Sequence, residues 1–313
     1  MSRPSERAAA LNLSMTPTEW ALLGLLSLLW GSSFFFIRVS VLELPPLVVV
    51  LLRVGLAALV LNLLLALRGK TLPRSATLWQ AFLVMGLINN ALPFTLIVWG
   101  EAHIGSGLAA ILNATTPMFT AAVAHAFTRD EKLTHGRVTG ILIGLAGVAV
   151  MIGPSAFAPG HGVLLAQLAI LGAATSYAFG TVFGRRFRTL GLSPLVAAAG
   201  QVTASSLILL PLTFAIDHPL ALPMPSWPAI GAVFGLGVLS TALAFILYFR
   251  ILATAGATNV SLVTLLVPVT AILLGTSLLG EHLGRVQILG MGLILLGLVV
   301  IDGRLLRHLT RWR

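Results

Sequence analysis

The sequence predicts an all-α integral membrane protein whose ten transmembrane helices form two inverted five-helix repeats. Three observations predict this fold: an apolar composition, an internal repeat, and basic residues that collect in alternate loops. The composition identifies lipid as the solvent, the repeat gives the number of halves, and the basic residues give the direction of each span.

The composition excludes an ordinary soluble domain. Hydrophobic residues make up 58% of the chain, charged residues 9%, and the mean hydropathy is +1.01. Soluble domains carry about a quarter charged residues. Several apolar windows reach about 18 residues or more, the length at which a helix crosses the hydrocarbon layer, whereas a barrel would show short alternating segments. The chain has no cysteine, so disulfides and thiolate metal sites are excluded.

An internal repeat divides the chain into two related halves. The segment 91–117 aligns without a gap on the segment 242–268. A repeat of this length governs the whole fold. With five spans in each half, an odd number, the second half must be inverted relative to the first, as in many secondary transporters. Identical pairs are Phe94 and Phe245, Leu96 and Leu247, Gly105 and Gly256, Pro117 and Pro268 and, after a one-residue slip, Glu131 and Glu281, Gly140 and Gly290, and Gly147 and Gly297.

Ten apolar segments follow in order, joined by connections too short to hold a soluble domain. Residues 1–18 form a polar tail, and the run after them has no convincing cleavage site, so we expect an uncleaved first span. Residues 19–153 make the first repeat, 162–303 the second, and 304–313 a basic tail. The expected spans are 19–38, 46–67, 77–99, 106–127, 136–153, 163–184, 194–216, 227–249, 257–279 and 286–302.

Lys and Arg set the orientation of these spans, because they accumulate in cytoplasmic loops. The opposite side holds only Arg38 and Arg285, and Arg53 alone lies inside a span. We therefore expect both termini to be cytoplasmic. This distribution explains the net charge of +10 without a nucleic-acid partner. The basic side holds Arg3, Arg7, Arg68, Lys70, Arg74, Arg129, Lys132, Arg137, Arg185, Arg186, Arg188, Arg250, Arg304, Arg307, Arg311 and Arg313.

The span at 106–127 is interrupted by polar residues and a proline. Pro117 has no amide hydrogen, so the carbonyl group of Asn113 loses its intrahelical partner. Lipid tolerates this loss only where side chains, neighbouring helices or cavity water replace the partner. Asn113, Thr116 and Pro117 share one small, polar stripe, which predicts either a cavity-lining helix or a kinked helix packed closely through small residues. Pro117 and Pro268 are the expected hinges.

A second polar interruption lies in the span at 77–99. Asn89 and Asn90 are adjacent, and Pro93 follows them. Two neighbouring amides point about 100° apart on a helix and cannot both face lipid at low cost. We expect one amide to bond an adjacent helix and the other to face a cavity, with Pro93 as a kink.

Several of these residues resemble a known family. Leu29-Trp30-Gly31-Ser32 with Phe36 and Arg38, then Arg53, and then the stretch 106–117 look like the EamA family of the drug/metabolite transporter superfamily. The resemblance covers residues 19–303 and implies two inverted bundles around a central cavity, with the fifth and tenth helices at the periphery. It is specific for the family and weak for the substrate, because members carry amino acids, drugs and other metabolites.

The second half departs from the first at positions expected to line the cavity, so recognition by charge belongs to the first half. Trp30 and Tyr177 are mid-span aromatics at equivalent positions, which favours a role in lining or gating the cavity. The replacements are Tyr177 for Trp30, Gln201 roughly for Arg53, and Thr264 for Asn113.

Arg53 is the strongest candidate for solute binding. A charge at the centre of a span costs at least about 2.5–3.5 kcal/mol on insertion scales, so such residues usually face a cavity or a partner. We interpret Arg53 as an anchor for a carboxylate or phosphate. The alternatives are snorkelling of its side chain to the outer interface and a structural bond to carbonyl groups freed near a kink.

No cofactor and no catalytic chemistry are expected. The histidines lack metal-ligand spacing, and no nucleotide-binding motif is present. Glu101 and His103 are expected to be solvated at the outer mouth. All nine acidic residues lie in tails, loops or span ends, whereas proton-driven carriers often use an embedded carboxylate. We therefore expect a facilitator, an exchanger or a weakly coupled exporter.

The resulting hypothesis is an exporter of small metabolites in a bacterial-type inner membrane, working by alternating access. Amino acids and related zwitterions or anions fit Arg53 best. Export of hydrophobic drugs or cations is the alternative within transport, and a lipid-translocating or lipid-binding subunit is the alternative from another class. The expected partners are a small solute and the bilayer. A homodimer is conceivable if glycines of the fifth and tenth spans pack against a second copy.

Overall fold

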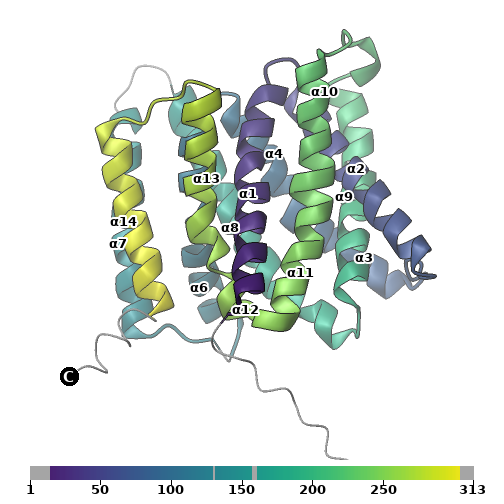
Figure 1. The fold of residues 1–313 in the computed structure, drawn as a ribbon, viewed down its shortest axis with the longest axis horizontal. Helices are drawn as coiled ribbons and strands as arrows, with labels where there is room; N and C mark the ends of the chain where they lie inside the picture. Colours follow the sequence, from purple (N-terminus) through teal and green to yellow (C-terminus); the bar gives the residue numbers. More distant parts are fainter. Residues whose placement is uncertain (1–14, 130, 157–160, 304–313) are drawn as a thin grey trace, which may run out of the picture.

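A computed structural model describes residues 15–129, 131–156 and 161–303, and its regular structure over these ranges is entirely helical. The helices run roughly along one axis, and the start of the first helix and the end of the last lie at the same, lower end of Figure 1. Nine described helices are long and apolar enough to cross a membrane, and an apolar helix at Val263–Leu278 is shorter. The predicted helical membrane fold is confirmed. Of the two predicted tails, residues 1–14 and 304–313 lie outside the described residues.

The first repeat contains five membrane segments, two of them built from more than one helix. Its first helix begins at a capping box: the Thr16 hydroxyl accepts a hydrogen bond from the Glu19 amide, while the Glu19 carboxylate accepts one from the Thr16 amide. Such reciprocal bonds satisfy amides that have no partner inside the helix. The elements are α1 (Pro17–Ser40), α2 (Pro46–Leu67), α3 (Ala76–Gly86) with the π-helical η1 (Leu87–Ala91) and α4 (Leu92–Glu101), α5 (Ser106–Asn113) with α6 (Thr116–Phe127), and α7 (His135–Ala156).

The second repeat follows the same order. Most bounds agree with the predicted spans to a few residues, although the sixth and eighth segments run further, to Thr189 and Ala255. The short η2 (Pro219–Ala221) precedes the eighth segment. The remaining elements are α8 (Gly162–Thr189), α9 (Pro194–Ile216), α10 (Trp227–Phe234) with the π-helical η3 (Gly235–Leu243) and α11 (Ala244–Ala255), α12 (Ala257–Val260) with α13 (Val263–Leu278), and α14 (Arg285–Asp302).

The packing between the repeats is symmetric. The equivalent helices α2 and α9 pack on each other, as do α7 and α14, and the contact of α1 with α13 has its counterpart in the contact of α8 with α6. These main contacts therefore have equivalents in the other half, as a two-fold relation between inverted repeats requires. The sequence-predicted architecture of two inverted five-helix repeats is confirmed.

Helices α7 and α14, the last segments of the two repeats, pack on each other at one side of the bundle (Figure 1). They meet through glycines in reciprocal pairs: a methyl group added at Gly290 would come within 2.8 Å of the Gly147 carbonyl oxygen, and one at Gly297 within 2.5 Å of the Gly140 carbonyl oxygen. Close approach of backbones is the usual role of small residues in membrane helices. The expectation that these glycines face a second copy is therefore not met at these four positions, which are used within the chain.

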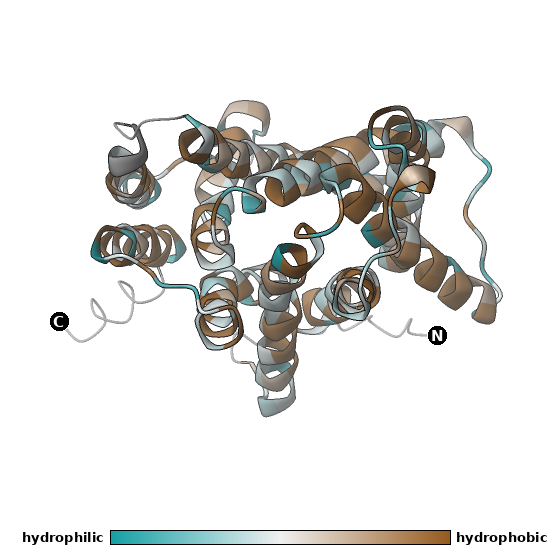
Figure 2. Ribbon diagram, turned by 90° about the horizontal axis from the view of Figure 1, so that it is seen from above, coloured by the Kyte–Doolittle hydropathy of each residue, from teal (hydrophilic) through white to brown (hydrophobic). Residues whose placement is uncertain are grey.

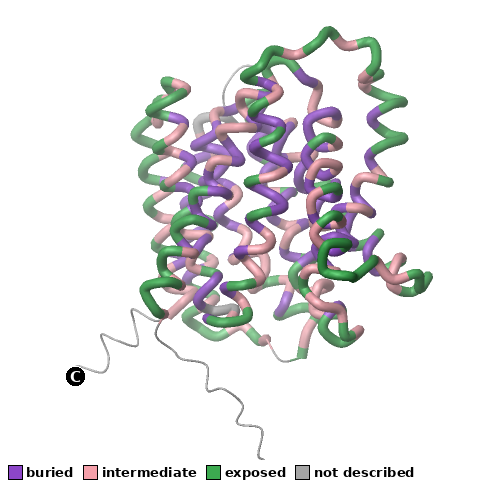
Figure 3. The backbone as a smooth tube through the Cα atoms, turned by 45° about the vertical axis from the view of Figure 1, so that its right-hand side comes forward, coloured by how far each residue is buried: buried purple, intermediate pink, exposed green. Residues whose placement is uncertain are grey.

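Apolar side chains cover the outside of the bundle as well as its interior. Seen from above, the ribbons of the outer helices are coloured largely brown, for hydrophobic residues (Figure 2). Buried residues follow the middle of the bundle, while exposed residues follow its rim (Figure 3). Leu59, Leu142 and Leu289 are more than half exposed. A surface of this kind suits lipid, where the backbone polar groups are already satisfied inside helices.

Candidate functional site

The same stretch of both repeats is widened into a π-helix. η1 occupies residues 87–91, and the repeat register places these on residues 238–242, inside η3. In η3 the Thr241 hydroxyl donates to the Leu236 carbonyl oxygen, five residues earlier, at 2.8 Å. Pro93 follows η1, but Ala244 stands at its equivalent position, so proline alone does not cause the widening. Short π-helical segments are frequent at functional sites.

Arg53 of α2 lies where the two repeats meet. Its side chain is 5% exposed, so it does not snorkel to the interface. Its Nε donates a hydrogen bond to the Thr241 hydroxyl at 3.0 Å, and its guanidinium carbon lies 3.7 Å from the centre of the Phe94 ring. Within the described part of the chain, Nη1 and Nη2 have no hydrogen-bond partner. The outer fork of a guanidinium is the part that can form two parallel hydrogen bonds to a carboxylate or phosphate.

Gln201 of α9 makes the equivalent contact from the second repeat. Its Oε1 accepts hydrogen bonds from the Nδ2 atoms of Asn89 at 3.1 Å and Asn90 at 3.3 Å. Gln201 stands at the place of Arg53, and Asn90 at that of Thr241, so the Arg53–Thr241 and Gln201–Asn90 contacts are symmetry counterparts. Both amides bond one helix, rather than one helix and one cavity. The buried Oδ1 of Asn90 has no partner among the described residues.

Two residues of this cluster, Thr241 and Phe94, are absent from the sequence-predicted site. The repeat register contains the signal for both. Thr241 aligns with Asn90, which was predicted, and Phe94 is identical to its counterpart Phe245. An apolar or hydroxyl residue in a membrane span gives no signal of function by itself. Its alignment with a residue of the other repeat gives such a signal.

The predicted aromatic residues pair across the repeats. The Trp30 ring of α1 lies 5.6 Å from the Tyr248 ring of α11, and the Tyr177 ring of α8 lies 6.4 Å from the Phe94 ring of α4. These separations are typical of favourable aromatic pairs. Because Phe94 also stacks on Arg53, the Tyr177 pair joins the polar cluster directly to α8.

The break in the first repeat lies at the predicted position. The chain leaves the helix between Asn113 and Thr116, and the Thr116 hydroxyl donates to the Asn113 carbonyl oxygen at 2.7 Å. This bond supplies the partner that Pro117 cannot. The Asn113 Oδ1 atom is buried and has no partner within the described ranges.

The break in the second repeat is displaced from the predicted hinge. α12 ends at Val260 and α13 begins at Val263, whereas Pro268 lies inside α13. The Thr264 hydroxyl donates to the Ser261 carbonyl oxygen at 2.7 Å, directly at this break. Proline alone therefore does not fix where the chain interrupts the helix, and the expectation of a break at Pro268 is corrected to residues 261–262.

The upper end of the bundle overturns one expectation. Glu101, expected to be solvated, is fully buried, and neither carboxylate oxygen has a hydrogen-bond partner in the described residues. The neighbouring Arg38 donates through Nη1 to the Glu101 backbone carbonyl oxygen at 2.8 Å, which caps the end of α4. Glu281 accepts hydrogen bonds from the amides of Ser106 and Gly107 and from the Ser106 hydroxyl. His103 is exposed, as expected.

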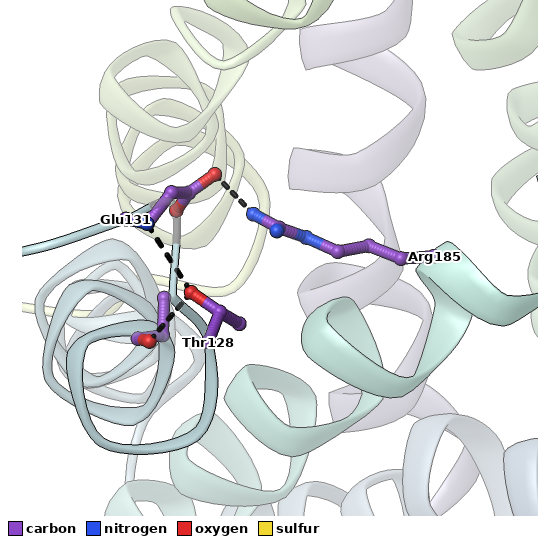
Figure 4. A network of polar contacts seen from close by, with 4 residues as sticks. Thr128, Glu131 and Arg185 are labelled. Carbon is purple, nitrogen blue, oxygen red and sulfur yellow. Dashed lines mark hydrogen bonds and ion pairs between the residues drawn. The ribbon is translucent and has the colours of Figure 1, made fainter.

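The lower end is joined across the repeats by an ion pair. Arg185 of α8 donates to Glu131 in the connection between α6 and α7, and the Glu131 amide donates to the Thr128 hydroxyl (Figure 4). Both charged side chains are more than a third exposed. Exposed pairs of this kind contribute only about 0–1 kcal/mol, so this link can be broken at small cost.

An open cavity of about 440 Å³ also lies at the lower end. It is bounded by α2, α9 and α11, and none of the predicted cavity residues lines it; the polar cluster around Arg53 is closed instead. No group of three potential metal ligands occurs in the described residues. The cavity is lined by Leu61, Leu64, Arg68, Lys70, Ser193, Pro194, Leu195, Ala198, Phe245, Ile246, Phe249 and Arg250.

A closed polar cluster between two inverted helical repeats defines a class, the multi-pass membrane transporters built by duplication. The EamA-like transporter family matches this chain twice, over residues 18–153 and 164–302. The chain belongs to that family. Several of its relatives are named as membrane transporters.

Named relatives and a solved structure agree with this assignment. The chain is 32% identical over 281 residues to the uncharacterized inner membrane transporter YedA of Escherichia coli K12, covering 88% of each chain. It is 27% identical to the uncharacterized transporter YoaV of Bacillus subtilis, covering 88% of this chain and 94% of that one. Protein PecM of Dickeya dadantii is 24% identical. A crystal structure with 23% identity superposes with a TM-score of 0.63 over 93% of this chain and 99% of the other, which supports the fold.

Proposed function

We propose that the protein exports amino acids or related zwitterions and anions by alternating access. The observation that carries the proposal is the buried guanidinium of Arg53, whose Nε is held by Thr241 while Nη1 and Nη2 lack partners within the described residues. A planar fork of this kind matches a carboxylate with two parallel hydrogen bonds. A buried guanidinium that forms no hydrogen-bonded ion pair is costly, which favours a site that binds an anionic group.

The amides around Gln201 complete the proposed site. Asn89 and Asn90 place neutral donors and acceptors in the equivalent position of the second repeat. Asn90 also retains an unpartnered buried Oδ1, which can accept a hydrogen bond from a substrate ammonium or hydroxyl group. The carboxylate would then lie towards Arg53 and the remainder of the solute towards the second repeat.

Alternating access would use the contacts at the two ends. Opening the lower end separates Arg185 from Glu131, which join opposite repeats, and opening the upper end separates Glu281 from the start of α5. The breaks between α5 and α6 and between α12 and α13 give each repeat a point at which the chain can bend. We place the lower end in the cytoplasm of a bacterial inner membrane, because basic residues gather there.

A second candidate is export of hydrophobic drugs or cations. Aromatic rings pair across the two repeats, Tyr177 with Phe94 at the cluster and Trp30 with Tyr248 between α1 and α11, and aromatic faces attract cations. Arg53 opposes this candidate, since it would repel a bound cation unless its charge is neutralised.

Counterflow in proteoliposomes distinguishes the two. We expect radiolabelled amino acids to exchange across wild-type vesicles, and Arg53→Ala to reduce this flux to that of protein-free liposomes, because the carboxylate loses its buried partner. Arg53→Lys keeps the charge without the fork and should retain a small part of the flux. Arg74→Ala, an exposed basic residue, serves as the matched control. Equal flux of the lipophilic cation tetraphenylphosphonium in wild type and Arg53→Ala would instead select the drug-exporter candidate.

A further inference from the structure

The starting point is a carboxyl group that the proposed site does not use. Glu101 ends α4, is fully buried, and has two carboxylate oxygens without a hydrogen-bond partner in the described part of the chain. An ionised carboxylate in such a position is among the most costly arrangements in a protein. Either the group carries a proton or the surrounding contacts open and let water reach it.

The neighbouring charges are committed elsewhere. Arg38 of α1 donates a hydrogen bond to the backbone carbonyl oxygen of Glu101 and not to its carboxylate. Glu281, beside the start of α5, is occupied by three donors from Ser106 and Gly107. Among the described residues no hydrogen bond therefore neutralises the Glu101 carboxylate. Arg38 and Arg53 act on it only as distant opposite charges, and the nearby Glu281 carboxylate adds a like charge.

The other elements packed on α4 are α2, α8, α5 and η1. α2 contributes Arg53 and α8 contributes Tyr177, which lie at the polar cluster around Arg53 (the solute cluster, formed by Arg53, Thr241, Phe94, Gln201, Asn89 and Asn90). α5 and η1 contain no titratable residue. His103, just beyond α4, is exposed, and its Nδ1 atom lies 2.9 Å from the Trp99 carbonyl oxygen. Arg53 interacts with Glu101 electrostatically but forms no hydrogen bond with it among the described residues.

Glu101 stands directly above the solute cluster. Phe94, Val98 and Glu101 have i, i+4 and i+7 spacing and share one face of α4, and Phe94 is the residue that stacks on Arg53. At 1.5 Å per residue, Glu101 lies about 10 Å above Phe94 along the helix. The position is therefore between the solute cluster and the upper surface.

The contacts around Glu101 form the closed upper end. At Gly100 an added methyl group would come within 2.8 Å of the Ile170 side chain and 3.2 Å of the Ala166 carbonyl oxygen, so α4 and α8 touch closely beside Glu101. Opening this contact would admit water to the carboxyl group. Closing it removes the water again.

We propose that Glu101 is a proton-binding site whose protonation is linked to closure of the upper end of the bundle. The closed arrangement holds the neutral carboxyl group, and the hydrated carboxylate favours the open one. By linkage, acid stabilises the closed arrangement and alkali the open one. This inference rests on the proposed alternating access, and it makes the proton the coupling ion, whereas the sequence led us to expect a facilitator, an exchanger or a weakly coupled exporter.

The absence of cysteine in the chain allows a test that needs no substrate. Val98→Cys places a single thiol on the buried face between Phe94 and Glu101, where Val98 is fully buried. The purified protein is labelled with a water-soluble maleimide from about pH 5 to about pH 9, and each rate is divided by that of the exposed Ala102→Cys to remove the pH dependence of the thiol. We expect the normalised rate to rise by about tenfold or more with pH, since the ionised fraction of a single group changes about tenfold per unit.

Three background variants assign the effect. Glu101→Gln should abolish the pH dependence, whereas His103→Gln and Glu43→Gln, which alter exposed groups at the same end, should preserve it. A normalised rate that does not change with pH, or a dependence that persists in Glu101→Gln, overturns the proposal.

An infrared titration of the unmodified chain covers the case in which Val98→Cys fails to fold. We expect a protonated-carboxyl absorption that disappears as the pH rises and that is missing in Glu101→Gln; its presence in that variant contradicts the proposal. Neither readout depends on the solute, so a failed counterflow assay would refute the proposed function while leaving this test intact, and the reverse also holds.

Discussion

At the scale of the residue, the solute cluster contains two symmetry-related contacts between the repeats, and the two contacts differ in chemistry. The first repeat supplies a charged donor, Arg53, to a hydroxyl group of the second, and the second supplies a neutral amide, Gln201, to the amides of the first. A duplicated fold gives two equivalent positions, and replacing one of them by a neutral residue leaves a single buried charge. In the proposed function, this asymmetry would distinguish one end of a solute from the other.

The Thr241 hydroxyl orients Arg53, so its removal should weaken solute binding without removing the charge. A hydrogen bond to a charged group contributes about 1.5–3 kcal/mol, which corresponds to roughly 10- to 100-fold in affinity. We expect Thr241→Val, which keeps the side-chain shape, to raise the apparent KM for amino-acid counterflow by this factor, with a smaller effect on the maximal rate.

Thr241→Ser restores the hydroxyl and should restore the KM. An unchanged KM in Thr241→Val, with the protein still monodisperse in detergent, would show that Phe94 stacking alone positions the guanidinium.

At the scale of the element, the helices deviate from regularity in the equivalent segments of each repeat. η1 and η3 widen the third and eighth segments, and breaks before Thr116 and Val263 divide the fourth and ninth. A regular membrane helix satisfies all its backbone groups internally, so irregular backbone is tolerated only where protein or a cavity covers it. These deviations lie on helices that meet the other repeat.

The α7–α14 pair offers a test of element packing. A methyl group at Gly290 would approach the Gly147 carbonyl oxygen to 2.8 Å, and one at Gly297 the Gly140 carbonyl oxygen to 2.5 Å. Overpacking of this kind costs about 1–3 kcal/mol. We expect Gly290→Ala and Gly297→Ala to lower the midpoint of thermal unfolding in detergent, followed by the fluorescence of the six tryptophans.

Gly292 on the same helix is the matched control, because nothing lies within 4 Å of a methyl group added there. Gly292→Ala should be neutral or slightly stabilising, since alanine favours helix over glycine by about 1 kcal/mol. Equal destabilisation by all three variants would mean that helix pairing is not the cause.

At the scale of the whole molecule, the two ends of the bundle carry equivalent charges in different arrangements. Glu131 and Glu281 are repeat counterparts, yet Glu131 pairs with Arg185 while Glu281 receives donors from Ser106 and Gly107. The lower contact is exposed and weak, whereas the upper one lies beside the buried Glu101. Each end is closed by groups from both repeats, so relative movement of the repeats must alter both.

The orientation of the whole molecule can be tested with single cysteines in a chain that has none. Leu220 in η2 is 88% exposed at the upper end, and Ala76 at the start of α3 is exposed at the lower end. Because basic residues gather at the lower end, a membrane-impermeant maleimide added to intact cells should label Leu220→Cys but not Ala76→Cys. Permeabilised cells should show labelling of both, and the opposite pattern in intact cells would invert the proposed orientation.

Several parts of the site could be predicted from residues alone. A polar side chain is costly in an apolar span unless it has a partner or faces a cavity, so such residues can be identified from the sequence. The structure brings four of them to the contact between the repeats: Arg53, Asn89, Asn90 and Gln201. Thr241 was not predicted, because a lone hydroxyl can satisfy itself on its own helix. Pro268 was expected to break its helix, but proline removes one hydrogen bond without dictating where the chain bends.

The sequence by itself determined the membrane class, the number of spans and the inverted repeat, because hydropathy and repetition are properties of the chain that need no neighbours. Only the tertiary structure decided what each polar group faces. Glu101 is the clearest case: at the end of a span it has the sequence context of a solvated residue, and the packing of α1, α4 and α8 buries it. Its carboxylate oxygens have no hydrogen-bond partner among the residues that the structure describes. Burial and pairing depend on residues far away along the chain, so no local pattern records them.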